Sequence, residues 1–578
     1  MLVAAASIVV LSTASPSLAV EPVSPARPSG DLILVGGAIY TMEADPRPVE
    51  AMVISAGKIL YTGDADEALR YKSGKSRVID VHGKVILPGL ADAHVHPAAG
   101  EFLLRRLCDV RAFTVEEGFA KARHCARIAP AGDWVVGYGW YDLDNAGYDK
   151  VTLAQLDALV ADRKLAILAK DMHSAWVNSK VLREFGITKG TPSPQGGEIV
   201  RDPATGEATG ELLDAAYHPI AEVIQYHSPY ALSNQELLKG AVAHLNSLGI
   251  TSMVDALVDD DMANAYHELD LKGQLNMRVE LAAPVSPSNY RTQIAHIAEN
   301  RSRWQSRRVR LDFVKVFADG NPEVGLASFL NHDGPPETST PGYYTQEQMT
   351  ELVRLAEQAQ LSVFVHVIGD GAVRQVLDAI AVARQASPET ERRHTLTHLN
   401  WVSTADMPRF KAMNVIANIQ EDWLAPSAFG GPPGYDYARS TAAGAIGPWL
   451  GGRTTPYRDL RDAGARIAAG SDWFYTEENP WRAMEAGITS KDPGGSNRQA
   501  MLPNYTLTLT DLLRARTSGA AYQMYREGEV GTLSVGKRAD FIIIDRDPFH
   551  TPVEQIHETH VIATYLDGSA VYSDEPSR

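Results

Sequence analysis

The two ends of the chain share one pattern of apolar and polar positions. The segments DLILVGGAIYTM, AMVISAGKILYTGD and SRVIDVHGKVILPGL join short apolar runs through glycine-containing turns, which predicts an all-β stretch from about residue 31 to 86. The pattern returns near the carboxyl terminus in EGEVGTLSVGKRADFIIIDRDPF and VIATYLDGSAVY. We therefore expect both ends to assemble into one small β-sandwich.

The middle of the chain alternates short apolar strands with helix-length segments, which is typical of βα units around a parallel sheet. Eight candidate strands can be counted, the number in a (β/α)8 TIM barrel. They lie at residues 85–94, 249–256, 277–284, 311–320, 362–370, 394–400, 415–420 and 466–472. The long separation between the first two predicts an insertion over the catalytic mouth, because βα loops leave a barrel at the carboxyl ends of its strands.

Composition narrows the class of protein. The 578 residues carry a formal net charge of −17, which argues against a nucleic-acid-binding protein, since phosphate contacts need clustered Lys and Arg. With 44% hydrophobic and 22% charged residues, the chain is globular rather than disordered. Two cysteines exclude a disulfide scaffold and a four-cysteine zinc site. Seventeen histidines instead favour nitrogen and oxygen ligands for any metal.

The first 19 residues, MLVAAASIVVLSTASPSLA, resemble a secretory signal cut after Ala19, although no Lys or Arg precedes the apolar run. Export to the periplasm or outside the cell is the expectation. The run is too short to span a bilayer, and no later stretch looks transmembrane. In an exported chain Cys108 and Cys125 could form a disulfide; two buried thiols are an equal alternative.

These patterns divide the chain into a series of predicted segments. The segments are 1–19 signal peptide, 20–30 linker, 31–85 and 526–578 β-sandwich, 86–99 and 249–525 barrel, and 100–248 insertion over the mouth.

Candidate metal ligands stand at the predicted strand ends. His94 and His96 lie two apart in the first strand and therefore face the same side. Further candidates follow on later strands: His366, His398 and Asp472. Lys315 interrupts the apolar strand LDFVKVF, where an unpaired ammonium would be costly. It either snorkels outward or takes up carbon dioxide to form a carbamate, an oxygen ligand that can bridge two metals.

The chain resembles the amidohydrolase superfamily, in particular its family 3 branch with the N-substituted formamide deformylases. The resemblance covers about residues 31 to 575 and rests on VILPGLADAHVHP, DMHSAWVNSKVL, PQGGEIVRDPATGEATGELLDAA, VKVFADG, HVIGD, RHTLTHLN, AAGSDWF and GTLSVGKRADFIIID. It implies one metal held by His94, His96 and Asp472, a second held by His366 and His398, and a bridging carboxylated Lys315 in a binuclear site. The family commonly has Glu before the sixth-strand histidine, whereas this chain has Thr397. The difference concerns a side chain that contacts a metal ligand, and the metal ligand His398 itself is kept.

The resemblance also implies the chemistry. One or two divalent ions, with zinc expected, would lower the pKa of bound water, and the hydroxide would attack a polarised carbonyl. Asp472 would pass the proton to the departing amine. His173 would contact the oxyanion; alternatively, Asp171, His173 and Asn178 only cap a helix. The predicted reaction is hydrolysis of a non-peptide carbon–nitrogen bond.

The predicted substrate is a small hydrophobic or aromatic N-acyl or amide compound. Aromatic residues near the expected mouth favour an apolar group, and the candidates are Trp140, Trp176, Trp423 and Trp473. Packing of the insertion onto the barrel is the alternative role for each. The alternative functions are hydrolysis of an ester, lactone, carbamate or phosphoester, isomerisation, and non-catalytic binding of a metal or ligand by an exported protein. A homo-oligomer is suggested only by analogy with other barrel hydrolases.

Overall fold

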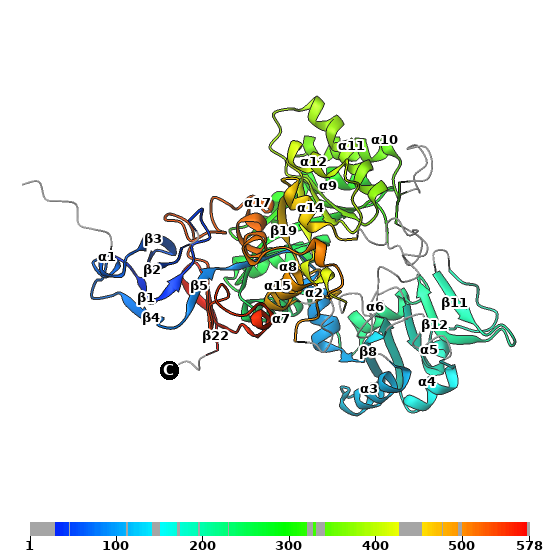
Figure 1. Cartoon of the computed structure of the whole chain (residues 1–578). Helices are drawn as coiled ribbons and strands as arrows, with labels where there is room; N and C mark the ends of the chain where they lie inside the picture. The colour runs from blue at the N-terminus through cyan, green and yellow to red at the C-terminus, as the bar shows by residue number, and fades with distance from the viewer. Residues whose placement is uncertain are drawn as a thin grey trace, which may run out of the picture.

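The computed structural model describes most of residues 29–574. The gaps are residues 46, 111–113, 141–150, 170–173, 195–196, 229, 321–326, 331–341, 427–453, 477 and 495–499. The predicted signal peptide and most of the linker therefore lie outside the described residues. Within the described part of the chain, three sheets with their helices account for the architecture (Figure 1).

The central sheet is a parallel eight-stranded barrel. Its strands follow the order β19-β18-β17-β16-β15-β14-β13-β6, which is chain order around the ring. They are β6 (Leu90–Val95), β13 (Ile250–Asp255), β14 (Arg278–Val285), β15 (Val309–Phe317), β16 (Ser362–Val367), β17 (Thr395–His398), β18 (Ile416–Ile419) and β19 (Arg466–Ala469). Hydrogen bonds from Asp472 N to His94 O and from His96 N to Trp473 O connect the last strand to the first. The predicted TIM barrel is confirmed.

Helices with one apolar face cover the barrel. In α10 the buried positions Met349, Leu352, Val353 and Ala356 recur at helical spacing and pack against the strands. The helices are α7 (Asn234–Ser247), α8 (Asp260–Leu271), α9 (Tyr290–Trp304), α10 (Gln346–Gln358), α11 (Asp370–Ala386), α12 (Met407–Ala412), α14 (Tyr457–Asp462), α15 (Pro480–Thr489), α16 (Leu509–Arg514) and α17 (Ala520–Gln523), with short turns η4 (Glu421–Leu424), η7 (Pro503–Tyr505) and η8 (Ala515–Gly519). No helix among the described residues is long and apolar enough to cross a membrane.

A second sheet lies in the segment between β6 and β13, where the sequence predicts an insertion. Its strand order is β11-β12-β10-β9-β8-β7, and it has its own apolar core around Val136, Leu168 and Leu212. The strands are β7 (Cys108–Asp109), β8 (Trp134–Trp140), β9 (Lys164–Ala169), β10 (Ser174–Val177), β11 (Gly197–Arg201) and β12 (Ala208–Asp214). The helices are α2 (Pro97–Gly100), η1 (Glu101–Arg106), α3 (Val115–Ile128), α4 (Leu153–Leu159), α5 (Ser179–Glu184) and α6 (His218–His227).

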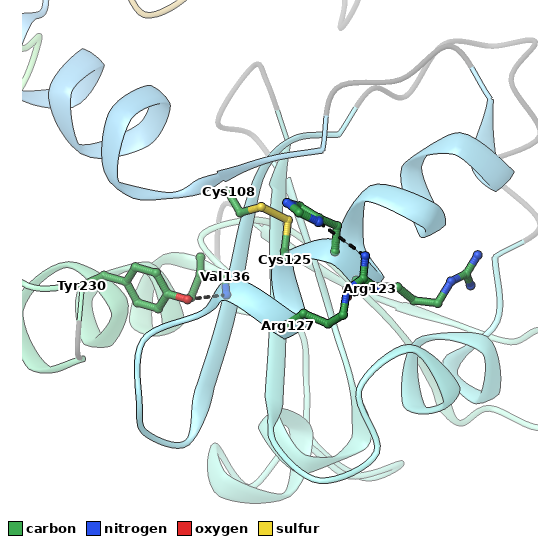
Figure 2. Close-up of a disulfide and its surroundings, with 7 residues drawn as sticks. Cys108, Arg123, Cys125, Arg127, Val136 and Tyr230 are labelled. Atoms are coloured by element: carbon green, nitrogen blue, oxygen red, sulfur yellow. Dashed lines mark hydrogen bonds between the residues drawn. A yellow bond between two sulfur atoms is a disulfide. The ribbon is translucent and has the colours of Figure 1, made fainter.

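A disulfide between Cys108 and Cys125 joins the edge strand β7 to helix α3 (Figure 2). Cys125 lies on the buried face of α3 and Cys108 starts the edge strand, with their Cα atoms 5.6 Å apart. Of the two alternatives that the sequence left open, the structure has the disulfide. The bridge constrains the segment that leads away from His96 through α2 and η1.

The third sheet combines both ends of the chain, as the sequence predicts. Its order is β22-β21-β20-β5-β1-β2-β3, with β4 also pairing with β1. The strands are β1 (Leu32–Ile39), β2 (Val49–Ser55), β3 (Lys58–Gly63), β4 (Arg77–Asp80), β5 (Val85–Pro88), β20 (Phe541–Ile544), β21 (Val561–Leu566) and β22 (Ser569–Ser573), accompanied by α1 (Ala65–Leu69) and η9 (Val553–Glu558). The sheet lies beside the barrel, away from the insertion (Figure 1).

The predicted continuous strand 85–94 is wrong in one respect, because the structure splits it between two sheets. β5 pairs with β20 in the terminal sheet, whereas β6 pairs with β13 in the barrel. The change occurs at Gly89, whose N–H donates to Asp540 O of the terminal sheet, while Leu90 N–H donates to Gly249 O beside the barrel. A Cβ at position 89 would lie 2.3 Å from Thr251 Oγ1, so only glycine fits this crossing.

Candidate metal centre

The predicted ligands converge at the carboxyl ends of the barrel strands. His94 lies in β6 and His96 directly after it, His366 lies in β16 and His398 ends β17. Asp472 follows β19 by three residues. Parallel strands present their carboxyl ends on the same side of the barrel, which is why positions so distant in sequence can meet.

Three of these side chains form a compact group. The ligand atoms of His94, His96 and Asp472 all lie within 4.8 Å of one another. Asp472 Oδ1 is 3.4 Å from His94 Nε2 and 3.2 Å from His96 Nε2. His94 and Asp472 are buried, whereas His96 is partly exposed, so the group is reached from the side of His96.

The other two histidines adjoin this group. The rings of His366 and His398 lie 4.6 Å apart, and the ring of His398 lies 5.0 Å from that of His94. Asp472 Oδ2 is 4.0 Å from His398 Nδ1, so the carboxylate faces the first group with one oxygen and His398 with the other. Asp319 Oδ1 lies 3.7 Å from His366 Nδ1 and accepts the backbone N–H of Ile368.

Lys315 points toward the metal ligands and not toward solvent. Its side chain is only 1% exposed, and Nζ lies 3.3 Å from His94 Nε2. The outward-snorkelling alternative is therefore wrong. Burial lowers the pKa of Lys315 to about 8, although the nearby Asp472 charge acts in the opposite direction. A larger fraction of this amine is thus uncharged near neutral pH than in an exposed lysine.

Two ligand positions adopt backbone conformations that side chains rarely occupy. His398 has φ of 77° and Asp472 has φ of 55°. Such left-handed residues cost about 1–3 kcal/mol and cluster at functional sites. Gly470, two residues before Asp472, allows the last strand to approach the first, because a Cβ there would lie 2.3 Å from His94 N. The strain is held by the hydrogen bond from Asp472 N to His94 O, 2.8 Å long.

The donor set fits a divalent metal. Burial, and then the positive charge of Lys315, holds the pKa of His94 well below its usual value. Burial, and then His366, does the same for the pKa of His398. Both imidazoles are therefore neutral, and each has one ring nitrogen whose lone pair can bind a metal. Nitrogen and oxygen donors gathered at this spacing are ligands that zinc and similar ions accept.

The four tryptophans predicted to contact substrate lie in different surroundings. Trp423 stacks on His398 with ring centroids 5.0 Å apart and planes at 5°, which places it beside the ligands. Trp473 is fully buried and packs against His244 and Gly100, and Trp176 is buried in the core of the insertion sheet. For these two the packing agrees with the alternative role that the sequence left open, and the substrate contact stays a prediction. The side chain of Trp140 lies outside the described part of the structure, as does His173.

The structure also brings residues to the site that the sequence reading missed. Phe317 lies 5.2 Å from His366, ring to ring, at the end of β15. Trp401 and Phe329 pack together near Trp423 in a small apolar cluster. Behind the ligands, Thr397 of β17 contacts His94, and Gln420, directly after β18, contacts His398. In VIANIQ, Asn418 and Gln420 interrupt an apolar strand at alternate positions, a signal that could have been recognised.

Comparison with known proteins finds one family profile and several relatives that match most of the chain. The amidohydrolase family profile matches residues 77–572. N-substituted formamide deformylase from Arthrobacter pascens is 26% identical over 557 residues, covering 94% of this chain and 98% of that protein. Protein LONG AFTER FAR-RED 3 from Arabidopsis thaliana is 25% identical over 564 residues, covering 95% and 92%.

A solved structure agrees on the fold. An uncharacterized metal-dependent hydrolase from Pyrococcus furiosus superposes with a TM-score of 0.66 at 24% identity, covering 89% of this chain and 99% of that one. The family profile extends from β4 in the terminal sheet, through the whole barrel, to β22. A match of this extent, on a barrel whose mouth collects metal-binding donors, makes the chain a member of the amidohydrolase family and a metal-dependent hydrolase.

Proposed function

We propose that this protein hydrolyses a non-peptide carbon–nitrogen bond in a small amide or N-acyl compound with an apolar or aromatic group. The observation that carries the proposal is the position of Asp472, whose Oδ1 lies 3.2 Å and 3.4 Å from two imidazole ligand atoms. A carboxylate so placed can contact both a bound ion and the reacting water. A divalent ion in this donor set supplies Lewis acidity that lowers the pKa of water toward neutrality and polarises a carbonyl.

Asp472 has the geometry to move the proton that amide hydrolysis requires. An amine is a poor leaving group until it is protonated, so the water proton must reach the nitrogen. Asp472 accepts that proton on one carboxylate oxygen and donates it to the departing amine. The backbone hydrogen bond from Asp472 N to His94 O keeps the carboxylate in place during both transfers. His173 remains our proposed partner for the oxyanion.

An apolar cluster beside His398 supports the substrate class. Trp423 covers one face of that ring, and Phe329 and Trp401 meet edge to face with centroids 5.3 Å apart. Ile368 and Met501 complete the cluster. Apolar surface next to the reacting centre favours an aliphatic or aryl substituent over a charged one. The similarity to a formamide deformylase also supports a carbon–nitrogen bond.

The test is a substrate panel with metal-loaded protein. We expect release of free amine from N-acyl amines, and faster turnover with apolar than with charged substituents. Esters and lactones of matched shape are the comparison, assayed by acid release. Turnover of esters or lactones without any amide hydrolysis would contradict the proposal and favour the alternative bond.

We also propose that zinc is the ion and that Lys315 carries a carbamate bridging two ions. The uncharged amine, favoured by burial, adds to carbon dioxide and releases one proton. Lys315→Ala is then expected to reduce the zinc content from two ions per chain to one, measured by elemental analysis. Lys315→Arg, which keeps a cation there but cannot form the carbamate, should lose an ion too. An unchanged zinc content in both variants would contradict the bridge.

Export is our proposal for localisation, in keeping with the signal-like first 19 residues. The disulfide between Cys108 and Cys125 supports it, because disulfides persist mainly in oxidising compartments.

A further inference from the structure

We propose that four buried polar residues behind the metal ligands act as positioning residues that fix His94 and His398 in the same tautomer. These residues, the amide layer, are Thr397 in β17, Asn418 in β18, Gln420 directly after it, and Gln523 in α17. All four are fully buried. In the proposed tautomer the proton is on Nδ1 of each imidazole, which leaves the Nε2 lone pair for the metal.

The amide layer is oriented by one backbone carbonyl. Ala93 O accepts hydrogen bonds from Asn418 Nδ2 at 3.0 Å and from Gln523 Nε2 at 2.9 Å. A carbonyl oxygen only accepts, so the groups that face it must be the amide NH₂ groups. Gln523 Oε1 then accepts from Asn418 Nδ2 at 2.9 Å, which agrees with this orientation. Asn418 Oδ1 must consequently point the other way, toward Thr397 and Gln420.

This orientation of Asn418 determines which ring nitrogen of His398 carries the proton. Gln420 Nε2 lies 3.1 Å from Asn418 Oδ1 and must donate to it, because two oxygens would repel. The other amide atom, Gln420 Oε1, therefore faces His398 Nδ1 at 2.9 Å. An amide oxygen has no proton to give, so His398 Nδ1 carries the hydrogen. The lone pair of His398 is left on Nε2.

The same argument shows which ring nitrogen of His94 carries the proton. Thr397 Oγ1 lies 3.0 Å from Asn418 Oδ1, which can only accept, so the single hydroxyl proton is used there. Thr397 Oγ1 is also 2.7 Å from His94 Nδ1 and must accept a hydrogen bond from it. His94 Nε2 thus presents its lone pair toward Asp472 Oδ1, 3.4 Å away. Two electron-rich atoms facing each other at this distance suit a cation between them.

The layer connects one ligand from each half of the site. His94 belongs to the group with His96 and Asp472, whereas His398 adjoins His366. The amide layer contacts both His94 and His398 and therefore orients both rings. The hydroxyl of Thr397 gives His94 Nδ1 the acceptor that this tautomer needs. Contacts behind metal ligands typically change metal affinity by about 10- to 100-fold when removed.

The experiment compares two substitutions of Thr397 by zinc affinity, measured by competition with a chelator. Thr397→Val keeps the shape and removes the hydroxyl, and we expect affinity to fall by about 10- to 100-fold. Thr397→Ser keeps the hydroxyl and should restore affinity to near the parent value. Equal affinity of the valine variant and the parent, or an equal loss in both variants, would overturn the proposal. No substrate is needed, so the outcome is independent of which bond the enzyme cleaves.

A second pair at Gln420 keeps the proposal falsifiable should Thr397→Val fail to fold. Gln420→Glu retains an oxygen that accepts from His398 Nδ1 but loses the amide donor to Asn418 Oδ1, so it should hold zinc less tightly than the parent and more tightly than Gln420→Leu. Gln420→Leu has no acceptor and should lose affinity. Chemical unfolding of the metal-free proteins provides the control, because a purely structural role would lower both properties together. Equal zinc affinity of the two Gln420 variants would overturn the proposal.

Discussion

Asp472→Asn is expected to lower amine release by at least about 10²-fold, the usual contribution of a positioned general acid–base group. The amide is nearly the same size as the carboxylate, so the left-handed backbone at φ 55° and the hydrogen bond to His94 O can persist. What changes is the chemistry. An amide cannot take a proton from water and deliver it to an amine, and it is a weaker metal ligand.

Metal content has to be measured with the rate, because Asp472 contributes to both. If the rate falls and zinc is retained, the loss is due to proton transfer. If both the rate and the zinc content fall, the loss is due to the role of Asp472 as a metal ligand. Asp378→Asn is the matched control, since this carboxylate lies in α11 with its side chain 48% exposed and pairs with Arg409. A variant at position 472 that keeps its zinc and its full rate would contradict the mechanism.

The barrel was predictable because each strand is a short, nearly continuous apolar run. SVFVHV in β16 is buried at five of its six positions, and only His366 is partly exposed. A polar residue in such a run is costly unless it has a function, which is why His366 and Lys315 could be identified. The split at Gly89 could not be predicted, since the apolar pattern continues through it and only Thr251, distant in sequence, makes glycine necessary.

The aromatic residues were harder to assign for a physical reason. Tryptophan serves packing and ligand binding with the same apolar surface, so sequence alone does not separate Trp473, packed on His244, from Trp423, stacked on His398. The partners that decide the role come from other strands and helices. The polar residues behind the ligands gave a clearer signal, because Asn418 lies in the otherwise apolar strand β18 and Gln420 follows it directly.

Arg278→Met is expected to cost about 3–5 kcal/mol at the junction between the barrel and the terminal sheet, the range for removing one partner of a buried ion pair. Arg278 starts β14, and its guanidinium donates to Asp540 at 2.7 Å and 2.9 Å and to Asp567 at 2.7 Å. The side chains of Arg278 and Asp540 are 1% and 2% exposed. Among the described residues, removal of the arginine leaves the buried Asp540 carboxylate with the backbone N–H of Asp567 as its one remaining donor.

Hydrogen exchange is the suitable measurement, because a chain with several sheets need not unfold in one step. We expect faster exchange in β20 and β21, which flank Asp540 and Asp567, with little change in the distant barrel strands β16 and β17. The double variant Arg278→Met with Asp540→Asn should recover part of the protection, since it removes the unpaired buried charge. Recovery would assign the loss to that charge and not to missing packing.

Arg307→Met provides the matched control on the same cluster. Arg307 also pairs with Asp567, at 2.5 Å, but its side chain is 58% exposed. Water screens that pair, so its loss is expected to cost under about 1 kcal/mol. Asp567 would keep Arg278 and also Arg308, whose Nη2 lies 3.2 Å away. Equal exchange rates in the Arg278 and Arg307 variants would show that the terminal sheet is held to the barrel by its apolar contacts and hydrogen-bonded strands alone.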